Sequence, residues 1–401
     1  MSDGYGWWVV TASPVTTTAS VSASHRLAWL DCLRGVGALA VVAEHMLPYV
    51  APALRPYTFN LGMYGVLVFF LVSGYIIPAS LERKGDIRAF WISRIFRLYP
   101  LYLLTIAVVL ALSWWVPVRA HVPRDPSSAA AHATMLLDVV HQAGMVDTMW
   151  TLSYEMVFYL LVTALFVAGV HRASGPISIV FGVVAIVAGL LLNAPLLKGT
   201  WPAYASFALF AVGMFCLITG HLRTIAAYTL GAVAVVLLMT GSYVPWLAAA
   251  ILASMFAGTA IYRWERGEAS LWPVLATGVL ITLSPFWSIH AGWWWVQPAA
   301  WTITILLATG TFAVGMALRR RRMPKVLAWL GLISYSLYLV HHPLLKYMLT
   351  ITGSLRDSAW HVQAAGAIGF VAMLLGVSWL TYRLVEAPMQ RLGRRIAKRY
   401  A

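Results

Sequence analysis

Long apolar runs are the feature that most constrains what this chain can fold into. About twelve of them, each near the length of a membrane-spanning helix, follow one another between short hydrophilic breaks. They lie at residues 28–50, 61–81, 98–118, 151–170, 176–193, 203–219, 225–241, 245–262, 271–289, 297–318, 326–350 and 362–386. Because the boundaries of such runs are soft, the pattern predicts an all-α integral membrane protein, a polytopic bundle of about 10–12 transmembrane helices.

Composition supports a lipid environment. Hydrophobic residues make up 61% of the chain and charged residues only 10%. A soluble domain of this length carries about 25% charged residues, so this chain cannot cover a water-facing surface.

The net charge of +15 fits the same environment. Lys and Arg gather in the breaks at 82–97 and 319–325 and after residue 388, whereas the breaks at 194–202 and 290–296 carry few. This positive-inside pattern indicates that both termini are cytoplasmic and that the basic residues face the anionic leaflet. Nucleic acid is not expected as a partner, because no basic groove module is readable.

The expected organisation is one membrane domain with a tail at each end. Residues 1–24 are rich in Ser, Thr and Ala and predict a flexible cytoplasmic tail. Residues 25–388 form the transmembrane domain, and residues 389–401 form a basic cytoplasmic tail. The break at 119–150 contains Pro123, Pro126 and a Ser pair, which predict an outward-facing loop.

Arg34 and His45 are ionisable residues inside the first apolar run. Eleven residues separate them, which places them about 20° apart around a helix and about 16 Å apart along it. Gly37 and Val41 lie between them on that face, and such a stripe predicts either a narrow slot or close helix packing with Arg34 extended to the headgroups.

Glu155 lies one turn into the apolar run that follows the long break. His45 lies in the outer half of its own helix, so the two side chains can occupy a similar depth. A carboxylate beside an imidazole fixes its tautomer and stabilises its cation. The alternative is that Glu155 only complements the positive end of its own helix.

Two further patterns have a functional and a structural interpretation. Arg94 and Arg97 share a helix face and suit a phosphate group, although their spacing alone favours a positive-inside anchor. Ser73 and Gly74 allow close approach of a ligand, or of a neighbouring helix, which their chemistry favours. No metal site is expected, since the adjacent His341 and His342 do not share a face.

Taken in order, these motifs resemble the membrane-bound acyltransferase-3 family. The resemblance rests on six segments: Leu30–Gly35, with Arg34 and His45 in an R-x10-H motif, Phe69–Tyr75, Arg94–Pro100, Trp150–Glu155 together with Phe158 and Tyr159, Ile333–His341, and Val385–Pro388. Each segment alone is weak, but the ordered set spans most of the chain.

The resemblance implies an O-acyltransferase of the bacterial inner membrane. The acyl group, usually acetyl, would pass from acetyl-CoA or another acyl-CoA to a hydroxyl of a carbohydrate or glycosylated product, with no metal. His45 would act as base or acyl carrier, oriented by Glu155, and Arg34 would hold the donor. The remaining site residues form two groups: Arg94, Arg97, Ser73 and Tyr75 on the donor side, and Trp150, Tyr154 and His341 on the acceptor side.

Two rival functions use the same residues differently. A proton-coupled transporter or flippase of a glycan or antibiotic intermediate would employ buried Arg, His and Glu as a relay, but no inverted repeat is evident. A non-catalytic subunit of a glycan-assembly complex would not need a buried cation and imidazole on one face.

Overall fold

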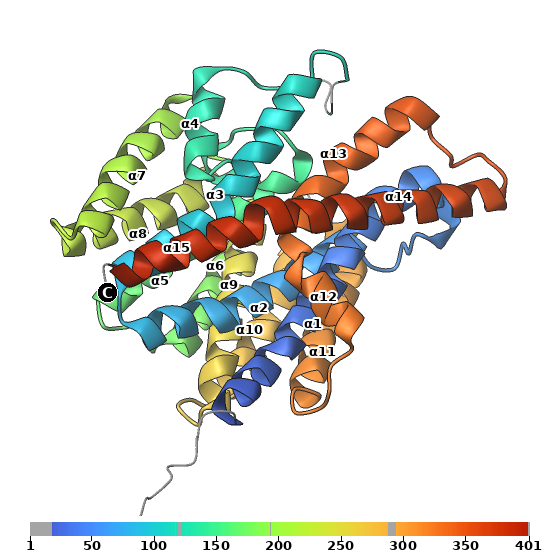
Figure 1. The fold of residues 1–401 in the computed structure, drawn as a ribbon. Coiled ribbons are helices and arrows are strands. Elements are labelled where there is room, and N and C mark those ends of the chain that lie inside the picture. Colours follow the sequence, from blue (N-terminus) through green and yellow to red (C-terminus); the bar gives the residue numbers. More distant parts are fainter. Residues whose placement is uncertain (1–17, 117, 119–121, 193, 288–293, 400–401) are drawn as a thin grey trace, which may run out of the picture.

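The computed structural model describes residues 18–116, 118, 122–192, 194–287 and 294–399, and every regular element in these ranges is helical (Figure 1). The long helices of the first part are α1 (Thr18–Val50), α2 (Leu61–Lys84), α3 (Ile87–Leu112), α5 (Trp150–Val167), α6 (Ser174–Leu191), α7 (Trp201–Thr219), α8 (Arg223–Thr240) and α9 (Pro245–Glu265). Those of the second part are α10 (Trp272–Leu283), α11 (Pro298–Ala317), α12 (Lys325–Leu332), α13 (Ser334–Thr352), α14 (Trp360–Thr381) and α15 (Ala387–Arg399).

Each of the predicted apolar runs coincides with helix, which confirms a polytopic all-α membrane protein. Within the described residues, 9 helices are long and apolar enough to cross a membrane. The helix α1 has 33 residues, but Asp31, Arg34 and Glu44 interrupt its apolar sequence. The run at 326–350 divides at Ile333 into α12 and α13, and α10 is a shorter apolar helix. These features explain why the number of clear spans is lower than the number of runs.

The centre of the bundle is α9, which packs against α2 and α6. Gly74 on α2 allows its backbone to touch α9, because a Cβ there would lie 1.8 Å from the carbonyl oxygen of Met255. The hydroxyl of Thr259 donates to the carbonyl of Gly74 at 2.8 Å across the same contact. For Gly74, the packing interpretation is therefore confirmed.

The break at 119–150 is not the open loop that its proline and serine residues predict. Where it is described, it contains the helix α4 (Pro126–Thr134) and the short turns η2 (Asp138–Val140) and η3 (Asp147–Met149). Asp125 caps α4 by accepting from the backbone N–H of Ser128, and Pro126 supplies the first helical residue. The apolar residues that follow α4 are fully buried, so this insertion packs into the bundle.

A buried histidine anchors the insertion. The backbone N–H of Met145 donates to Nε2 of His132 at 3.2 Å, so this nitrogen carries a lone pair. Nδ1 therefore carries the proton and donates to the hydroxyl of Tyr102 on α3 at 2.6 Å. Burial lowers the pKa of His132 to about 4, because the charged ring would lose its hydration.

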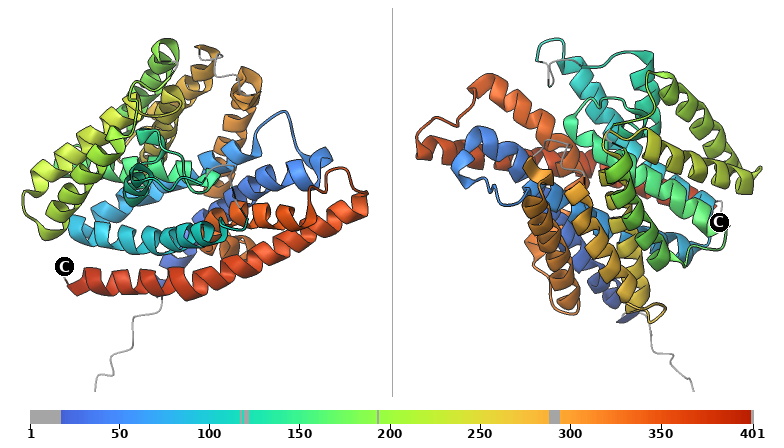
Figure 2. Two further views of the ribbon diagram at one scale, coloured as in Figure 1. Left: turned by 90° about the horizontal axis from the view of Figure 1, so that it is seen from above. Right: turned by 180° about the vertical axis from the view of Figure 1, so that it is seen from behind.

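The structure describes only part of the two expected tails. Residues 1–17 lie outside the described residues, and α1 already begins at Thr18. At the other end, α14 continues through a π-turn, η7 (Tyr382–Glu386), into α15, and the two form one rod beside α3 (Figure 2). Gly393 and Ala397 of α15 are buried against α3, and Arg391, Arg394 and Arg395 are exposed.

Candidate active site

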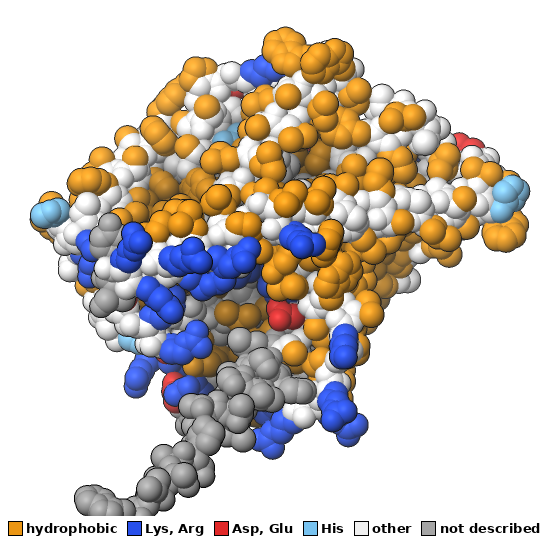
Figure 3. All heavy atoms as spheres, viewed as in Figure 1, with side chains coloured by type: hydrophobic (Ala, Val, Ile, Leu, Met, Phe, Trp, Pro, Cys, Tyr) orange, Lys and Arg blue, Asp and Glu red, His pale blue; other side chains and the backbone are white. Residues whose placement is uncertain are grey.

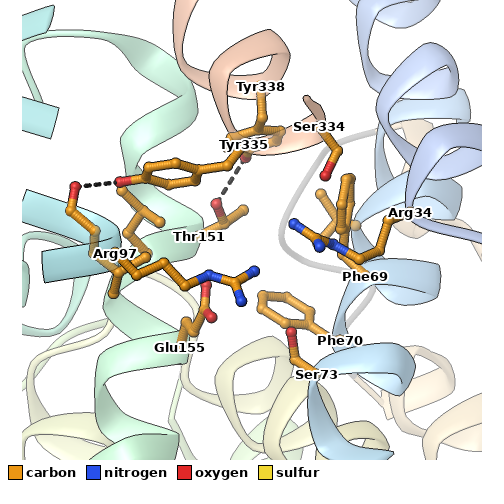
Figure 4. Close-up of a pocket in the computed structure, with 13 residues that line it drawn as sticks. Arg34, Phe69, Phe70, Ser73, Arg97, Thr151, Glu155, Ser334, Tyr335 and Tyr338 are labelled. Carbon is orange, nitrogen blue, oxygen red and sulfur yellow. Dashed lines mark hydrogen bonds between the residues drawn. The ribbon is translucent and has the colours of Figure 1, made fainter. Parts of the chain in front are cut away.

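A small polar pocket lies where α1, α2, α3, α5 and α13 converge (Figure 4). Its volume is about 70 Å³, which is room for a few groups the size of a water molecule. We call it the arginine pocket, and its lining consists of Arg34, Val66, Phe69, Phe70, Ser73, Arg97, Leu98, Thr151, Leu152, Glu155, Ser334, Tyr335 and Tyr338. Four of the predicted site residues, Arg34, Ser73, Arg97 and Glu155, meet here.

The two arginines enter the pocket from opposite sides. Figure 4 shows the guanidinium groups of Arg34 and Arg97 directed toward each other across it, with Glu155 beside Arg97. Nη1 of Arg34 lies 3.7 Å from Oδ1 of Asp31, one turn earlier on α1. Arg97 interacts electrostatically with the carboxylates of Glu155 and Glu386. Two cations facing one small cavity form an anion-binding arrangement.

Arg94 does not line this pocket, although it shares a helix face with Arg97. Its side chain is buried, with the guanidinium carbon 5.2 Å from the ring centre of Phe90 and 5.3 Å from that of Tyr159. The hydroxyl of Tyr159 donates in turn to Glu155. Arg94 therefore supports the residues behind the pocket rather than facing a ligand in it.

The upper wall of the pocket is made by two tyrosines of α13. The hydroxyl of Tyr335 donates to the carbonyl of Leu98 at 2.7 Å, and the hydroxyls of Tyr338 and Thr151 are 2.7 Å apart. The ring of Tyr338 also packs edge-on against Phe69, with ring centres 6.0 Å apart. These contacts tie α13 to α3, α5 and α2 around the pocket.

A histidine cluster lies beyond that wall. It consists of His45 on α1 with His341 and His342 on α13, and the ring centres of His45 and His341 are 5.1 Å apart. The ring of Tyr338 separates it from the arginine pocket, with its centre 5.9 Å from that of His341. Nε2 of His342 lies 3.4 Å from Oδ2 of Asp147 in η3.

Hydrogen bonds fix the tautomers of His45 and His341. Nδ1 of His341 lies 2.7 Å from the carbonyl oxygen of Tyr338, and Nδ1 of His45 lies 2.8 Å from that of Val41. A carbonyl can only accept, so both Nδ1 atoms carry protons. Nε2 of His341 lies 3.3 Å from Nδ1 of His45, so it shares this single proton as the second and longer acceptor beside the Val41 carbonyl. The neutral His45 ring is left with a lone pair on Nε2, the form required of a general base.

Glu155 and His45, expected as a pair, belong to different clusters. The carboxylate of Glu155 faces the arginine pocket and bonds to Tyr159, whereas the hydrogen bonds of the His45 ring go to Val41 and His341. The contact that sequence reasoning assigned to Glu155 is made by His341. The two histidines lie 296 residues apart in the chain.

The slot expected between Arg34 and His45 is closed. Gly37 faces Gly65 of α2, where a Cβ on Gly65 would lie 2.4 Å from the carbonyl oxygen of Gly37. Val41 is 2% exposed and packs on the same glycine. Close packing of α1 on α2, the alternative to a slot, therefore describes this stripe, and Tyr338 lies between the arginine pocket and His341.

Three other predicted site residues lie outside the arginine pocket. The hydroxyl of Tyr75 donates to Glu265, and that of Tyr154 donates to Asp138 in the insertion. Trp150 packs edge-on against Tyr154, with ring centres 5.7 Å apart. Burial raises the pKa of Asp138 to about 6.

Sequence reasoning missed Thr151, Tyr335 and Glu386 as neighbours of the arginines. All three lie within the quoted motif segments, so their positions were flagged but their roles were not. Glu386 is buried, accepts from the hydroxyl of Ser336 at 2.9 Å and lies in the π-turn that directs it inward. Among the described residues, no group of three or more His, Cys, Asp or Glu side chains is arranged to hold a metal ion.

The chain belongs to a known family of acyltransferases. The acyltransferase domain of the acyltransferase-3 family matches residues 27–383. With the helices described above, this defines a multi-pass membrane acyltransferase. No solved structure matches the chain.

Similar proteins carry related names. Acyltransferase MdmB of Streptomyces mycarofaciens is 28% identical over 396 residues, which is 92% of this chain and 93% of that protein. Peptidoglycan O-acetyltransferase OatA of Listeria monocytogenes is 23% identical and matches 91% of this chain. Putative peptidoglycan O-acetyltransferase YrhL of Bacillus subtilis is also 23% identical over 91% of the chain. The chain spans 56% and 55% of the length of the latter two.

Proposed function

We propose that this membrane acyltransferase moves an acyl group, acetyl first among the candidates, from acyl-CoA to a hydroxyl of a sugar or glycosylated product. The proposal places the protein in the bacterial cytoplasmic membrane with both termini in the cytoplasm, where CoA is made. The positive-inside pattern supports this orientation. Two relatives with names of peptidoglycan O-acetyltransferases support acetyl as the group and a glycan as the acceptor.

The observation that carries the proposal is the hydrogen-bond chain from Tyr338 through His341 to His45. It leaves a lone pair on Nε2 of His45, whose Nδ1–H is shared between the Val41 carbonyl at 2.8 Å and Nε2 of His341 at 3.3 Å. When His45 takes up a proton, that Nδ1–H bond strengthens, because its donor becomes cationic. His341 is therefore a positioning residue that stabilises the imidazolium of His45.

The transfer step follows from this arrangement. Nε2 of His45 removes the proton of the acceptor hydroxyl while the oxygen attacks the carbonyl carbon of the thioester. The carbon–sulfur bond of the tetrahedral intermediate then breaks, and the departing CoA thiolate takes the proton from His45. An ester and free CoA result, and the His45 ring returns to its starting tautomer.

The arginine pocket holds the donor in this proposal. Arg34 and Arg97 present two guanidinium groups to negatively charged or strongly polar groups of acyl-CoA. Glu155, held by Tyr159, balances the charge of Arg97 when the pocket is empty. Arg94, beneath Tyr159, fixes that carboxylate indirectly, which replaces the direct phosphate contact predicted from its spacing.

Radiolabelled acetyl-CoA tests the donor. The purified protein in liposomes is expected to release CoA and to transfer label to a glycan acceptor fraction. A protein that neither consumes acetyl-CoA nor labels any acceptor, but moves a glycan lipid across the bilayer, would support the transporter instead.

Surface glycans test the acceptor. Their masses, compared before and after deletion of the gene, are expected to differ by one acetyl group on a single sugar. Unchanged glycan masses, together with loss of an acetyl group from a small glycosylated product on deletion, would identify that product as the acceptor.

A further inference from the structure

The helix α11 has an apolar groove on each side, distinct from both polar clusters. One groove lies between α9, α10 and α11, has a volume of about 420 Å³ and includes Ile261, Leu275, Ile305, Phe312 and Met316. The other lies between α1, α11 and α12, with a volume of about 480 Å³, and includes Trp29, Val36, Leu307, Val314 and Leu327. We call them the α10 groove and the α12 groove.

Glycine keeps both grooves open. Gly278 lies in the α10 groove and Gly310 in the α12 groove. A Cβ added at either position would meet no atom within 4 Å. The space beside these glycines is therefore not filled by any described part of the protein.

Both grooves end at the same basic loop. Arg319 lines the α10 groove, and Met323 and Pro324 line the α12 groove. Between them, Arg320, Arg321 and Arg322 are exposed. Within the described ranges, none of these three has a carboxylate within 4 Å, whereas Nε of Arg319 bonds to Oε1 of Glu265 at 2.8 Å.

Figure 3 shows where basic and hydrophobic side chains lie on one face of the molecule. Lys and Arg side chains gather over α15 and at the end of α11 and α12, and hydrophobic side chains cover much of the remaining surface. A polybasic segment beside a bilayer attracts anionic lipid by about 1 kcal/mol per cationic residue. Guanidinium groups add bidentate hydrogen bonds to phosphate.

We propose that an anionic phospholipid binds astride α11, with its phosphate on Arg320–Arg322 and one acyl chain in each groove. Both the shape of the grooves and the charge of the loop fit such a lipid. Two apolar grooves that flank one helix and meet at cations with no carboxylate partner among the described residues match a molecule with two apolar chains joined at one anionic group. The proposal does not depend on the acyl-transfer reaction.

Lipid affinity is measured on the full-length protein in detergent, by native mass spectrometry with phosphatidylglycerol and with phosphatidylcholine of the same chains. The unaltered protein is expected to retain phosphatidylglycerol at least tenfold more tightly. Equal retention of the two lipids would overturn the proposal.

Two sets of variants separate the grooves from the charge. Gly278→Leu with Gly310→Leu places a side chain in each groove, starting from a Cβ position that meets no atom within 4 Å. Arg320→Ala with Arg321→Ala and Arg322→Ala removes the three exposed cations. Each set is expected to lower phosphatidylglycerol affinity at least tenfold. Undiminished affinity in the glycine pair would show that the loop binds headgroups alone and would refute the use of the grooves.

Matched controls exist on α14 and α15. Gly369 and Gly376 also have no atom within 4 Å of an added Cβ but line neither groove, so their Leu variants should keep full affinity. Arg391→Ala with Arg395→Ala and Arg399→Ala removes the same number of charges from α15. This variant should leave the phosphatidylglycerol affinity within twofold of the unaltered protein. Displacement of the lipid by inorganic phosphate at equal concentration would indicate a plain anion site and contradict the proposal.

Discussion

Arg34 and His45, which lie at the two ends of one face of α1, are surrounded by different kinds of groups. At one end, Arg34 faces Arg97 across a pocket, and the carboxylates of Asp31, Glu155 and Glu386 interact with the two guanidinium groups. At the other end, His45 lies in a buried cluster where neutral rings and backbone carbonyls determine each proton position. Two guanidinium groups directed into one pocket are suited to binding an anion, and a ring nitrogen with an unused lone pair is suited to accepting a proton. We therefore infer that donor binding belongs to the Arg34 end of α1 and proton transfer to the His45 end.

Removal of His45 should cause the largest loss on the chemical side. His45→Ala is expected to lower kcat for acetyl transfer by about 1,000-fold, since a positioned general base contributes about 10²–10⁴-fold. Acetyl-CoA binding should remain within threefold of the unaltered protein, because His45 lies outside the arginine pocket. Equilibrium binding and initial rates measured on the same membranes check both parts. A kcat within tenfold of normal would remove His45 from the mechanism.

His341 should matter next, through His45. His341→Ala is expected to lower kcat about 10–100-fold, the equivalent of about 1.5–3 kcal/mol for a hydrogen bond to a charged group. His341→Gln should recover part of the loss, because its amide oxygen can accept from Nδ1–H of His45. The pH dependence of kcat is the second readout: Ala should shift its acidic limb, which reports protonation of His45, toward lower pH because the imidazolium loses an acceptor, whereas Gln should restore it. Identical profiles for Ala and Gln would indicate a packing role only.

Substitutions in the arginine pocket should weaken donor binding more than they lower kcat. Arg97→Ala is expected to raise KM for acetyl-CoA about tenfold with a smaller change in kcat, consistent with loss of a charged hydrogen bond. Arg97→Lys keeps the charge but loses the planar fork, so it should be intermediate.

The neighbouring Arg94 is the matched control for that binding effect. Because it is buried between the rings of Phe90 and Tyr159, Arg94→Ala should mainly lower the melting temperature. Thermal unfolding in detergent distinguishes the two arginines. Equal effects of both variants on KM, with unchanged stability, would return the phosphate role to Arg94.

Substitution of His132 should have the smallest effect, and it should change the pH dependence of stability rather than acyl transfer. Both of its nitrogens have protein partners, and its folded pKa of about 4 lies below the ordinary value of 6.5. The unfolded chain therefore takes up a proton first as pH falls, and stability present above pH 6.5 is lost progressively toward pH 4. Between pH 7.5 and 5.5 the loss should be about 1 kcal/mol. His132→Gln, which keeps an acceptor for Met145 but does not titrate, should flatten this dependence in denaturation experiments. An unchanged pH slope would contradict this assignment.

Sequence patterns were sufficient to locate the apolar helices of this fold and several residues of the candidate pocket. Apolar runs locate the helices because lipid imposes their length and composition. Arg34, Ser73, Arg97 and Glu155 were predicted as site residues because ionisable or small polar residues in such helices are rare, and the structure places them around one pocket. The partner of His45 was not found, since α1 and α13 meet only in the folded bundle and spacing along one helix carries no information about another.

The same limit explains the closed slot and the packed insertion. The spacing of Arg34, Gly37 and Val41 correctly places them on one face, but the sequence of α1 does not reveal that Gly65 of α2 fills that face. The prolines and serines before Trp150 predict a loop, yet Asp125 and Pro126 start a helix there. The spacing along α1 was correct, whereas the loop prediction was wrong because a local cap and a proline at the first helical position start α4.

A double-mutant cycle on His45 and His341 tests the central claim most directly. If the two rings act as one unit, His45→Ala combined with His341→Ala should transfer acetyl no more slowly than His45→Ala alone, measured as kcat at saturating acetyl-CoA. Losses that instead multiply, so that the double variant is slower by the product of the single effects, would show that the histidines act independently and would contradict the account.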